Sequence, residues 1–298
     1  MENQAALAAH FEGSRSHLRA VAFRMLGTTH EADDALQEAW LRASHADSTG
    51  IANVAGWLTT IVGRVCLDML RSRKRAREEL TEATELERVA PQEPALGPED
   101  EAALANSVGL ALLVVLDTLG PAERVAFVLH DLFAVPFDDI AAIVQRSAVA
   151  AKKLASRARH RVHGIPAAPA ADIARHRAIV HAFLTASRSG DLDGLLAVLA
   201  PDVVRRADAS ALRGDAHALE VRGAREVAEE TRTNADRARF ARPILVNGQV
   251  GAVIAPHGRL LLVLALTIEG DRIAVIDVIH DPARLRQLRL NVVDAKAA

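Results

Sequence analysis

Hydrophobic spacing changes once along this 298-residue chain, and the change limits the folds open to it. From residue 5 to about 80, and again from about 99 to 163, apolar residues recur at intervals of three and four, as at Leu18, Val21 and Met25. That spacing is typical of helices that bury one face. The first half of the chain is therefore expected to be all-α.

Beyond residue 240 the pattern turns to short runs of β-favouring residues. Turn-forming Asn, Gly, Pro and Asp residues separate these runs, which is typical of consecutive strands. A helix at Asp172–Ser187 and a shorter one before Pro201 precede them. The sequence therefore predicts an α+β region whose strands are Ile244–Val246, Val250–Ile254, Leu260–Ile268 and Ile273–Ile279.

Two stretches divide the chain into candidate domains. Residues 81–105 hold seven acidic residues and one Arg together with three Pro and one Gly, and residues 165–171 read Ile-Pro-Ala-Ala-Pro-Ala-Ala. Both compositions are typical of linkers. The expected domains are residues 1–80, 106–164 and 172–290.

Composition excludes some classes of protein. Cys66 is the one cysteine, so the chain cannot form an intramolecular disulfide. No basic segment with a following apolar run marks a signal peptide, and the apolar stretches are too short to span a bilayer. We expect a cytoplasmic protein without membrane contact. The net charge of −2 does not indicate a nucleic-acid binder, but the distribution of charge does.

The strongest local signal lies in residues 136–163. A short apolar helix is followed by a turn at Gln145-Arg146, and Ser147 is a favourable N-cap for a second helix. Six Lys or Arg and no acidic residue fall within residues 145–163. This pattern predicts a helix-turn-helix that binds DNA, although a solvated basic helix on an ordinary bundle would look similar. The candidate DNA-binding residues are Ser147, Lys152, Lys153, Ser156, Arg157 and Arg159.

Two further segments carry charge in a regular pattern. A basic run at Arg71, Arg73, Lys74 and Arg75 closes a helix expected to run from about Val54 to Arg77. This basic run could contact DNA phosphates, or it could be the solvent-exposed C-terminal end of a helix. Upstream, another helix directs Leu36, Trp40 and partly Leu41 inward. Its expected charged face consists of Asp33, Asp34, Gln37, Glu38 and Arg42.

Taken together and in this order, these segments resemble an extracytoplasmic-function sigma factor of the sigma-70 family. Gly27–Ser44 is similar to the family's region that binds core RNA polymerase. Trp57–Arg71 is similar to the region that melts and reads the −10 element, and Pro121–His163 to the domain that reads the −35 element. The resemblance implies a non-enzymatic protein without a cofactor, whose partners are core RNA polymerase and promoter DNA.

The resemblance also assigns roles in −10 recognition. Arg64 stands where many members of the family have Asn, in the promoter-melting helix. The loop from Ser44 to Asn53 would lie near a flipped base of the non-template strand, and Asn53 is the candidate residue there. The set implied for the −10 element is Asn53, Arg64, Arg71, Arg73, Lys74 and Arg75.

Residues 172–290 resemble the SnoaL-like extension, a cone-shaped α+β fold, found in one subgroup of these sigma factors. The subgroup's Gly-rich motif is replaced here by Asp208–Leu212. Because it is covalently tethered, the domain is expected to modulate the sigma domains or their linker by intramolecular contact. Relatives of the cone include enzymes, which leaves two possible roles for its polar residues. Two of them could form a catalytic acid–base pair, or all could be surface residues with local hydrogen bonds. The residues concerned are Asp202, Asp208, His217, Asp277 and His280.

Two other interpretations of the whole chain remain open at this stage. The first is a small-molecule enzyme or sensor whose helical half is a regulatory DNA-binding module. The second is a structural helical adaptor, which would make no salt-dependent contact with DNA. The sensor would bind DNA without polymerase, whereas a sigma factor acts with it.

Overall fold

The computed structural model describes residues 2–47, 50–83, 107–164, 169–208 and 219–293. The chain divides into two compact units. Residues 1–103 and 116–160 make up the first unit, and residues 104–115 and 161–298 make up the second. Among the described helices, none is long and apolar enough to cross a membrane.

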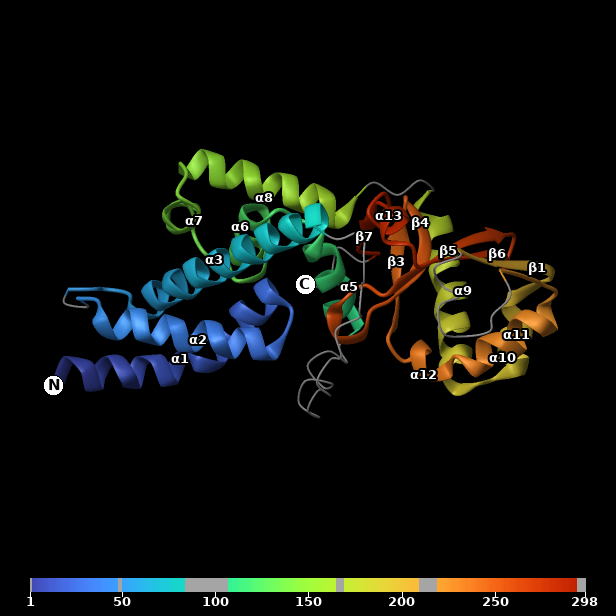
Figure 1. Ribbon diagram of the computed structural model, residues 1–298, viewed down its shortest axis with the longest axis horizontal. Helices are drawn as coiled ribbons and strands as arrows, with labels where there is room; N and C mark the ends of the chain where they lie inside the picture. Colours follow the sequence, from blue (N-terminus) through green and yellow to red (C-terminus); the bar gives the residue numbers. More distant parts are fainter. Residues whose placement is uncertain (1, 48–49, 84–106, 165–168, 209–218, 294–298) are drawn as a thin grey trace. The chain divides into compact units, whose positions relative to one another are not determined.

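The first three helices of the first unit form a bundle (Figure 1). They are α1 (Glu2–Leu26), α2 (Thr29–His45) and α3 (Val54–Ala83). Gly27 separates α1 from α2 with a φ of +93°, a conformation that glycine adopts without steric cost. Thr28 caps α2 reciprocally: its Oγ1 accepts from the Glu31 N–H at 3.2 Å and donates to the Glu31 carboxylate at 2.8 Å.

Helix α3 is the central element of the first unit. Nine of the thirteen residues from Leu58 to Leu70 are buried, Thr60 and Met69 are half-buried, and Arg64 and Asp68 are exposed. A helix that is apolar on most sides must be covered on most sides. Helices α1 and α2 contact α3, and so do two later helices.

The helices that follow in sequence begin with α5 (Ser107–Asp117) and α6 (Pro121–Phe127). As expected, Pro121 opens α6, where a missing N–H costs no hydrogen bond. A π-helical turn (Val128–Leu132) leads to α7 (Phe137–Val144) and α8 (Ala148–His163). The helix expected from residue 99 is described only from Ser107, and most of the acidic stretch 81–105 lies outside the described residues.

Contact between α3 and α7 depends on a small residue. A Cβ on Gly63 would lie 3.1 Å from Ile143 Cδ1 and 3.4 Å from Leu129 Cδ1, so the absence of a side chain at Gly63 leaves room for these two residues. Ile140, Ile143 and Val144 of α7 are buried. The bundle and the helix-turn-helix therefore share one apolar core in the first unit.

The second unit is α+β, as predicted. Its described strands form one seven-stranded sheet in the order β2-β1-β6-β5-β4-β3-β7. Strands β1 and β6 pair in parallel, and every other neighbouring pair is antiparallel. The strands are β1 (Leu199–Ala207), β2 (Glu220–Arg222), β3 (Ala241–Val246), β4 (Gln249–Ile254), β5 (Leu262–Glu269), β6 (Arg272–Ile279) and β7 (Leu290–Asn291).

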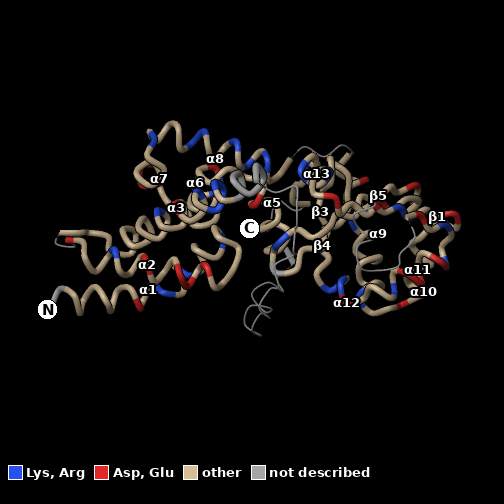
Figure 2. The backbone as a smooth tube through the Cα atoms, in the orientation of Figure 1, with Lys and Arg blue, Asp and Glu red and all other residues tan. Residues whose placement is uncertain are grey.

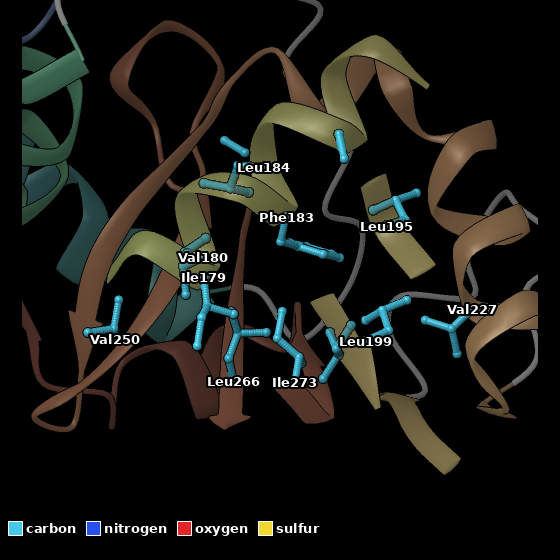
Figure 3. Close-up of a cluster of buried hydrophobic side chains, with 14 of the residues drawn as sticks. Ile179, Val180, Phe183, Leu184, Leu195, Leu199, Val227, Val250, Leu266 and Ile273 are labelled. Atoms are coloured by element: carbon cyan, nitrogen blue, oxygen red, sulfur yellow. The ribbon is translucent and has the colours of Figure 1, made fainter. Parts of the chain in front are cut away.

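Helices cover one face of this sheet, and apolar side chains from the helices and the strands pack between them (Figure 3). One buried cluster joins the helices of this unit to the sheet. It includes Phe183 and Leu184 from the helix at Ala170–Ser189, Leu195 from the next helix, and Leu266 and Ile273 from the sheet. The helices of the second unit are α9 (Ala170–Ser189), α10 (Leu192–Val198), α11 (Ala224–Thr233), α12 (Ala235–Ala238) and α13 (Pro282–Leu285), with a 3₁₀ turn at Pro256–Gly258.

Local signals located the hairpins, but the strand bounds differ from those expected. Asn247 and Gly248 both have positive φ (52° and 86°), which suits the two-residue turn between β3 and β4. Strand β5 begins at Leu262 rather than Leu260, after the 3₁₀ turn. Helix α9 begins at Ala170, directly after Pro169 and two residues before the expected start at Asp172.

Strand packing at Gly251 gives a testable prediction. A Cβ there would lie 2.5 Å from the backbone oxygen of Leu264 on the neighbouring strand, and that oxygen cannot move aside. We expect Gly251→Ala to lower the free energy of unfolding of the second unit by about 1 to 3 kcal/mol. Urea unfolding followed by circular dichroism measures this change.

The matched control is Gly270→Asn, at a turn where an added Cβ would meet no atom within 4 Å and where Asn tolerates the φ of +59°. It should cost much less than Gly251→Ala. Both tryptophans, Trp40 and Trp57, lie in the first unit, so their fluorescence transition should stay unchanged. Equal loss in the two variants would contradict the proposed clash.

The Cys66 thiol is expected to be inert. It is fully buried in α3, and burial raises its pKa from 9.0 to about 12. Because the unfolded thiol ionises at lower pH, it should decrease stability as pH rises from about 9 to 12. Cys66→Ala should therefore show a smaller fall in stability across that window, measured by urea unfolding. Rapid reaction of the native thiol with a thiol reagent at pH 8 would contradict this burial.

Candidate nucleic-acid interface

The turn between α7 and α8 has the local geometry that the sequence predicts. Gln145 ends α7 in the left-handed region (φ 57°, ψ 52°), which turns the chain sharply. Ser147 Oγ then accepts from the Ala150 N–H at 3.2 Å, confirming Ser147 as the cap of α8. A tight turn followed by a capped second helix is the arrangement that places a helix in the major groove.

Helix α8 packs through one narrow stripe of small residues. Ala151, Ala155, Ala158 and Val162 are buried, at spacings of four, three and four. These positions share one side of a helix with 3.6 residues per turn. The remaining residues of the helix are exposed or half-buried.

All six residues predicted for the −35 element are exposed on α8 or at its cap. Figure 2 shows the succession of basic positions along α8. Arg159 differs from the others because its Nε donates to Asp131 at 2.6 Å, and this hydrogen bond raises the pKa of Arg159. The other cations predicted for this surface are Lys152, Lys153 and Arg157.

The residues predicted for the −10 element differ in their exposure and in their partners. Arg64 is exposed on α3, and its Nη2 donates to the Ala142 carbonyl of α7 at 3.4 Å. Arg73 instead faces the bundle, where it hydrogen bonds to the Leu26 carbonyl at 3.2 Å and pairs with Glu31. Arg71 is half-buried, and Lys74 and Arg75 are exposed.

Asn53 has a structural task that sequence reasoning did not assign. It precedes α3, and its Oδ1 accepts from the Gly56 N–H at 2.9 Å, the geometry of a helix N-cap. The residue itself is exposed. An Asn directly before a helix is a recognisable capping signal, so the sequence contained the information for this role.

The charged face predicted on α2 is present. Asp33, Asp34, Gln37, Glu38 and Arg42 are all exposed, opposite a buried face of Ala32, Ala35, Leu36, Ala39 and Ala43. Ion pairs order this face: Asp33 with Arg19 at 2.8 Å, and Arg42 with Glu38 at 2.9 Å and with Asp68 at 3.2 Å.

The structure adds two features beside that face. Leu41 is 48% exposed, so about half of its surface is open to solvent. A groove of about 620 Å³ runs between α1 and α2, and it is lined by Phe11, Arg15, Arg19, Trp40 and neighbouring residues. The rings of Phe11 and Trp40 lie 5.1 Å apart although 29 positions separate them in sequence, so no local pattern could have linked them.

Polar residues of the second unit act as caps. Asp208 Oδ2 accepts from the backbone N–H groups of His280 at 2.9 Å and Asp281 at 2.8 Å. Asp281 in turn caps α13. Asp202 is exposed, Asp277 is partly buried in β6, and His217 lies outside the described residues. These contacts favour local hydrogen bonding over an acid–base pair.

Comparison with known proteins gives two family matches in chain order. Residues 11–76 match sigma-70 region 2, and residues 109–162 match sigma-70 region 4. The first match covers the α1–α3 bundle, and the second covers α5 to α8.

Relatives extend the similarity over the second unit. The chain is 34% identical over 286 residues to the probable ECF RNA polymerase sigma factor SigI of Mycobacterium tuberculosis, covering 95% of this chain and 96% of the relative. It is 43% identical over 201 residues to the ECF RNA polymerase sigma factor SigJ of the same species, covering 67% and 64%.

A crystal structure of M. tuberculosis SigJ covers 93% of this chain and 98% of that chain, at 34% identity and a TM-score of 0.46. The identity to SigI over almost the whole of both chains, with sigma-70 regions 2 and 4 in order, decides the classification. The chain belongs to the extracytoplasmic-function family of RNA polymerase sigma factors.

Proposed function

We propose that this protein binds core RNA polymerase through the exposed face of α2 and directs it to promoters by reading two DNA elements. In this proposal α3 and its neighbours contact the −10 element, and α8 enters the major groove of the −35 element. The observation that carries the proposal is the exposed basic helix after a capped tight turn, in a chain with sigma-70 regions 2 and 4. The protein would act in the cytoplasm, where bacterial RNA polymerase works.

The exposed residues of α8 and of α2 suit different partners. Lys152 and Arg157 are exposed cations suited to phosphates, and such contacts release counterions and set the salt dependence of binding. On α2, the ordered ion pairs and exposed Leu41 make a mixed polar and apolar surface. A surface of this kind suits a protein partner better than DNA.

The first test is run-off transcription with core polymerase and genomic promoter fragments. Changing both Lys152 and Arg157 to Ala should reduce initiation, because two phosphate contacts are lost. The salt dependence of promoter binding by the holoenzyme should then become shallower by about two in the log–log slope. The control is a double change of Arg225 and Arg286, exposed cations of the second unit, to Ala.

Each outcome bears on a different part of the proposal. Protein-dependent initiation with the expected loss supports it. Binding to core without any effect of the α8 changes would remove α8 from promoter reading. Failure of the wild-type protein to bind core would overturn the sigma assignment and favour a ligand sensor.

We infer further that the second unit modulates promoter reading by capping the end of α8. The last residues of α8 belong to this unit. Asn291 Nδ2 donates to the Arg161 carbonyl at 2.7 Å, and the Val292 N–H donates to the Val162 carbonyl at 2.8 Å. These carbonyls are among the last four of the helix, which have no partner within the helix itself.

Asn291→Ala tests this capping role in the full-length chain. Loss of one hydrogen bond to a helix end should let the last turn fray and decrease initiation by roughly threefold. The control, Asn234→Ala, removes a comparable bond to the Glu230 carbonyl elsewhere in the second unit. The same loss in both variants, or no change in either, would count against modulation through the α8 cap.

A further inference from the structure

The exposed side of α8 has a definite centre. The buried stripe comprises residues 151, 155, 158 and 162, and at 100° per residue the line opposite it comprises residues 149, 153, 156 and 160. All four are exposed: Val149, Lys153, Ser156 and His160. Lys153 and Ser156 are among the residues predicted from the sequence to bind DNA, and Val149 is not, because an isolated valine carries no DNA-binding signal.

Val149 is unusual among the described apolar residues. Its exposed fraction is 66%, the largest of the exposed large hydrophobic side chains. A β-branched residue in an exposed helical turn has a lower helix propensity than alanine and gains no packing there. Exposed single apolar residues are common, so exposure alone does not assign a role. Its place in the first turn of the second helix of a helix-turn-helix does point to one, since the N-terminal residues of that helix contact base edges.

Charges lie on both sides of the central line. On a helical wheel Lys152 falls about 70° to one side of it, and Arg157 falls about 70° to the other. Phosphates form both walls of a DNA groove, and the base edges form its floor. A helix with cations on both flanks therefore directs its central line to the floor. Val149 is the apolar member at the N-terminal end of that line.

We infer that Val149 is a specificity-determining residue, whose isopropyl group contacts the C5-methyl of a thymine in the −35 element. The thymine methyl is the apolar group that the major groove presents, and it is recognised by apolar side chains. The inference rests on the proposed function, because it requires α8 to enter that groove. It assigns Val149 a task that the cations cannot perform, since phosphates carry no sequence information.

The test removes the methyl group from the DNA and the isopropyl group from the protein separately. Each thymine of the −35 element, on either strand, is replaced by deoxyuridine, which lacks only the C5-methyl. Promoter binding by full-length protein with core polymerase is then measured for wild type and Val149→Ala. At one position, deoxyuridine should weaken wild-type binding about fourfold, the equivalent of one buried methyl group. In Val149→Ala the same replacement should have no effect.

Two control variants sharpen the comparison. Val149→Ile keeps an apolar β-branched side chain and should keep the sensitivity to deoxyuridine. Lys152→Ala should weaken binding to thymine and deoxyuridine promoters equally, because a phosphate contact does not sense the base. Val149 is exposed and alanine is the better helix former, so the Val149→Ala chain should fold.

The outcomes separate this inference from the proposed function. If scrambling the whole −35 element leaves binding unchanged, both are overturned. If binding depends on the −35 element but no thymine shows the deoxyuridine effect, the Val149 inference alone fails. It also fails if the effect persists in Val149→Ala, or if the element contains no A·T pair.

Discussion

Burial of α3 from several sides is the constraint on which the first unit depends. Helices α1, α2, α6 and α7 all contact it, and Gly63 allows α7 to approach. This core also encloses the Arg124 guanidinium, which is 3% exposed and pairs with Asp117 at 2.5 Å. Burial lowers the pKa of Arg124, because removing water disfavours its charged form. Removing one partner of such an ion pair is costly, so the pair holds the start of α6 to the end of α5.

The second unit shows why a fold does not establish an activity. The covered face of its sheet is filled by apolar side chains such as Phe183, Leu195 and Ile276. Asp208, a residue that suits an acid–base pair, instead accepts two backbone N–H groups. Within this unit, Asn291 and Val292 hydrogen bond to the Arg161 and Val162 carbonyls at the end of α8. That arrangement is consistent with a SnoaL-like extension that serves a sigma factor.

Sequence signals succeeded where a few neighbouring residues decide the structure. Ser147, Pro121 and the turn at Asn247-Gly248 act within one helical turn or hairpin, so their roles could be predicted from the sequence. Arg73 could not be placed, because its inward position depends on Glu31, 42 residues away. The same holds for the parallel pairing of β1 with β6 and for the groove between Phe11 and Trp40. Side-chain direction at such places is set by tertiary packing, which the periodicity of one segment does not contain.

The hydrogen bond between Arg64 and the Ala142 carbonyl joins the two regions of the chain that match sigma-70 regions 2 and 4. It spans 3.4 Å from Arg64 Nη2 on α3 to the backbone of α7, so any movement of region 4 away from region 2 must break it. Residues 84–106 join the two helical modules, and 23 residues can span at most about 80 Å when fully extended. The distance that region 4 can move away from region 2 is therefore limited by the covalent length of this segment.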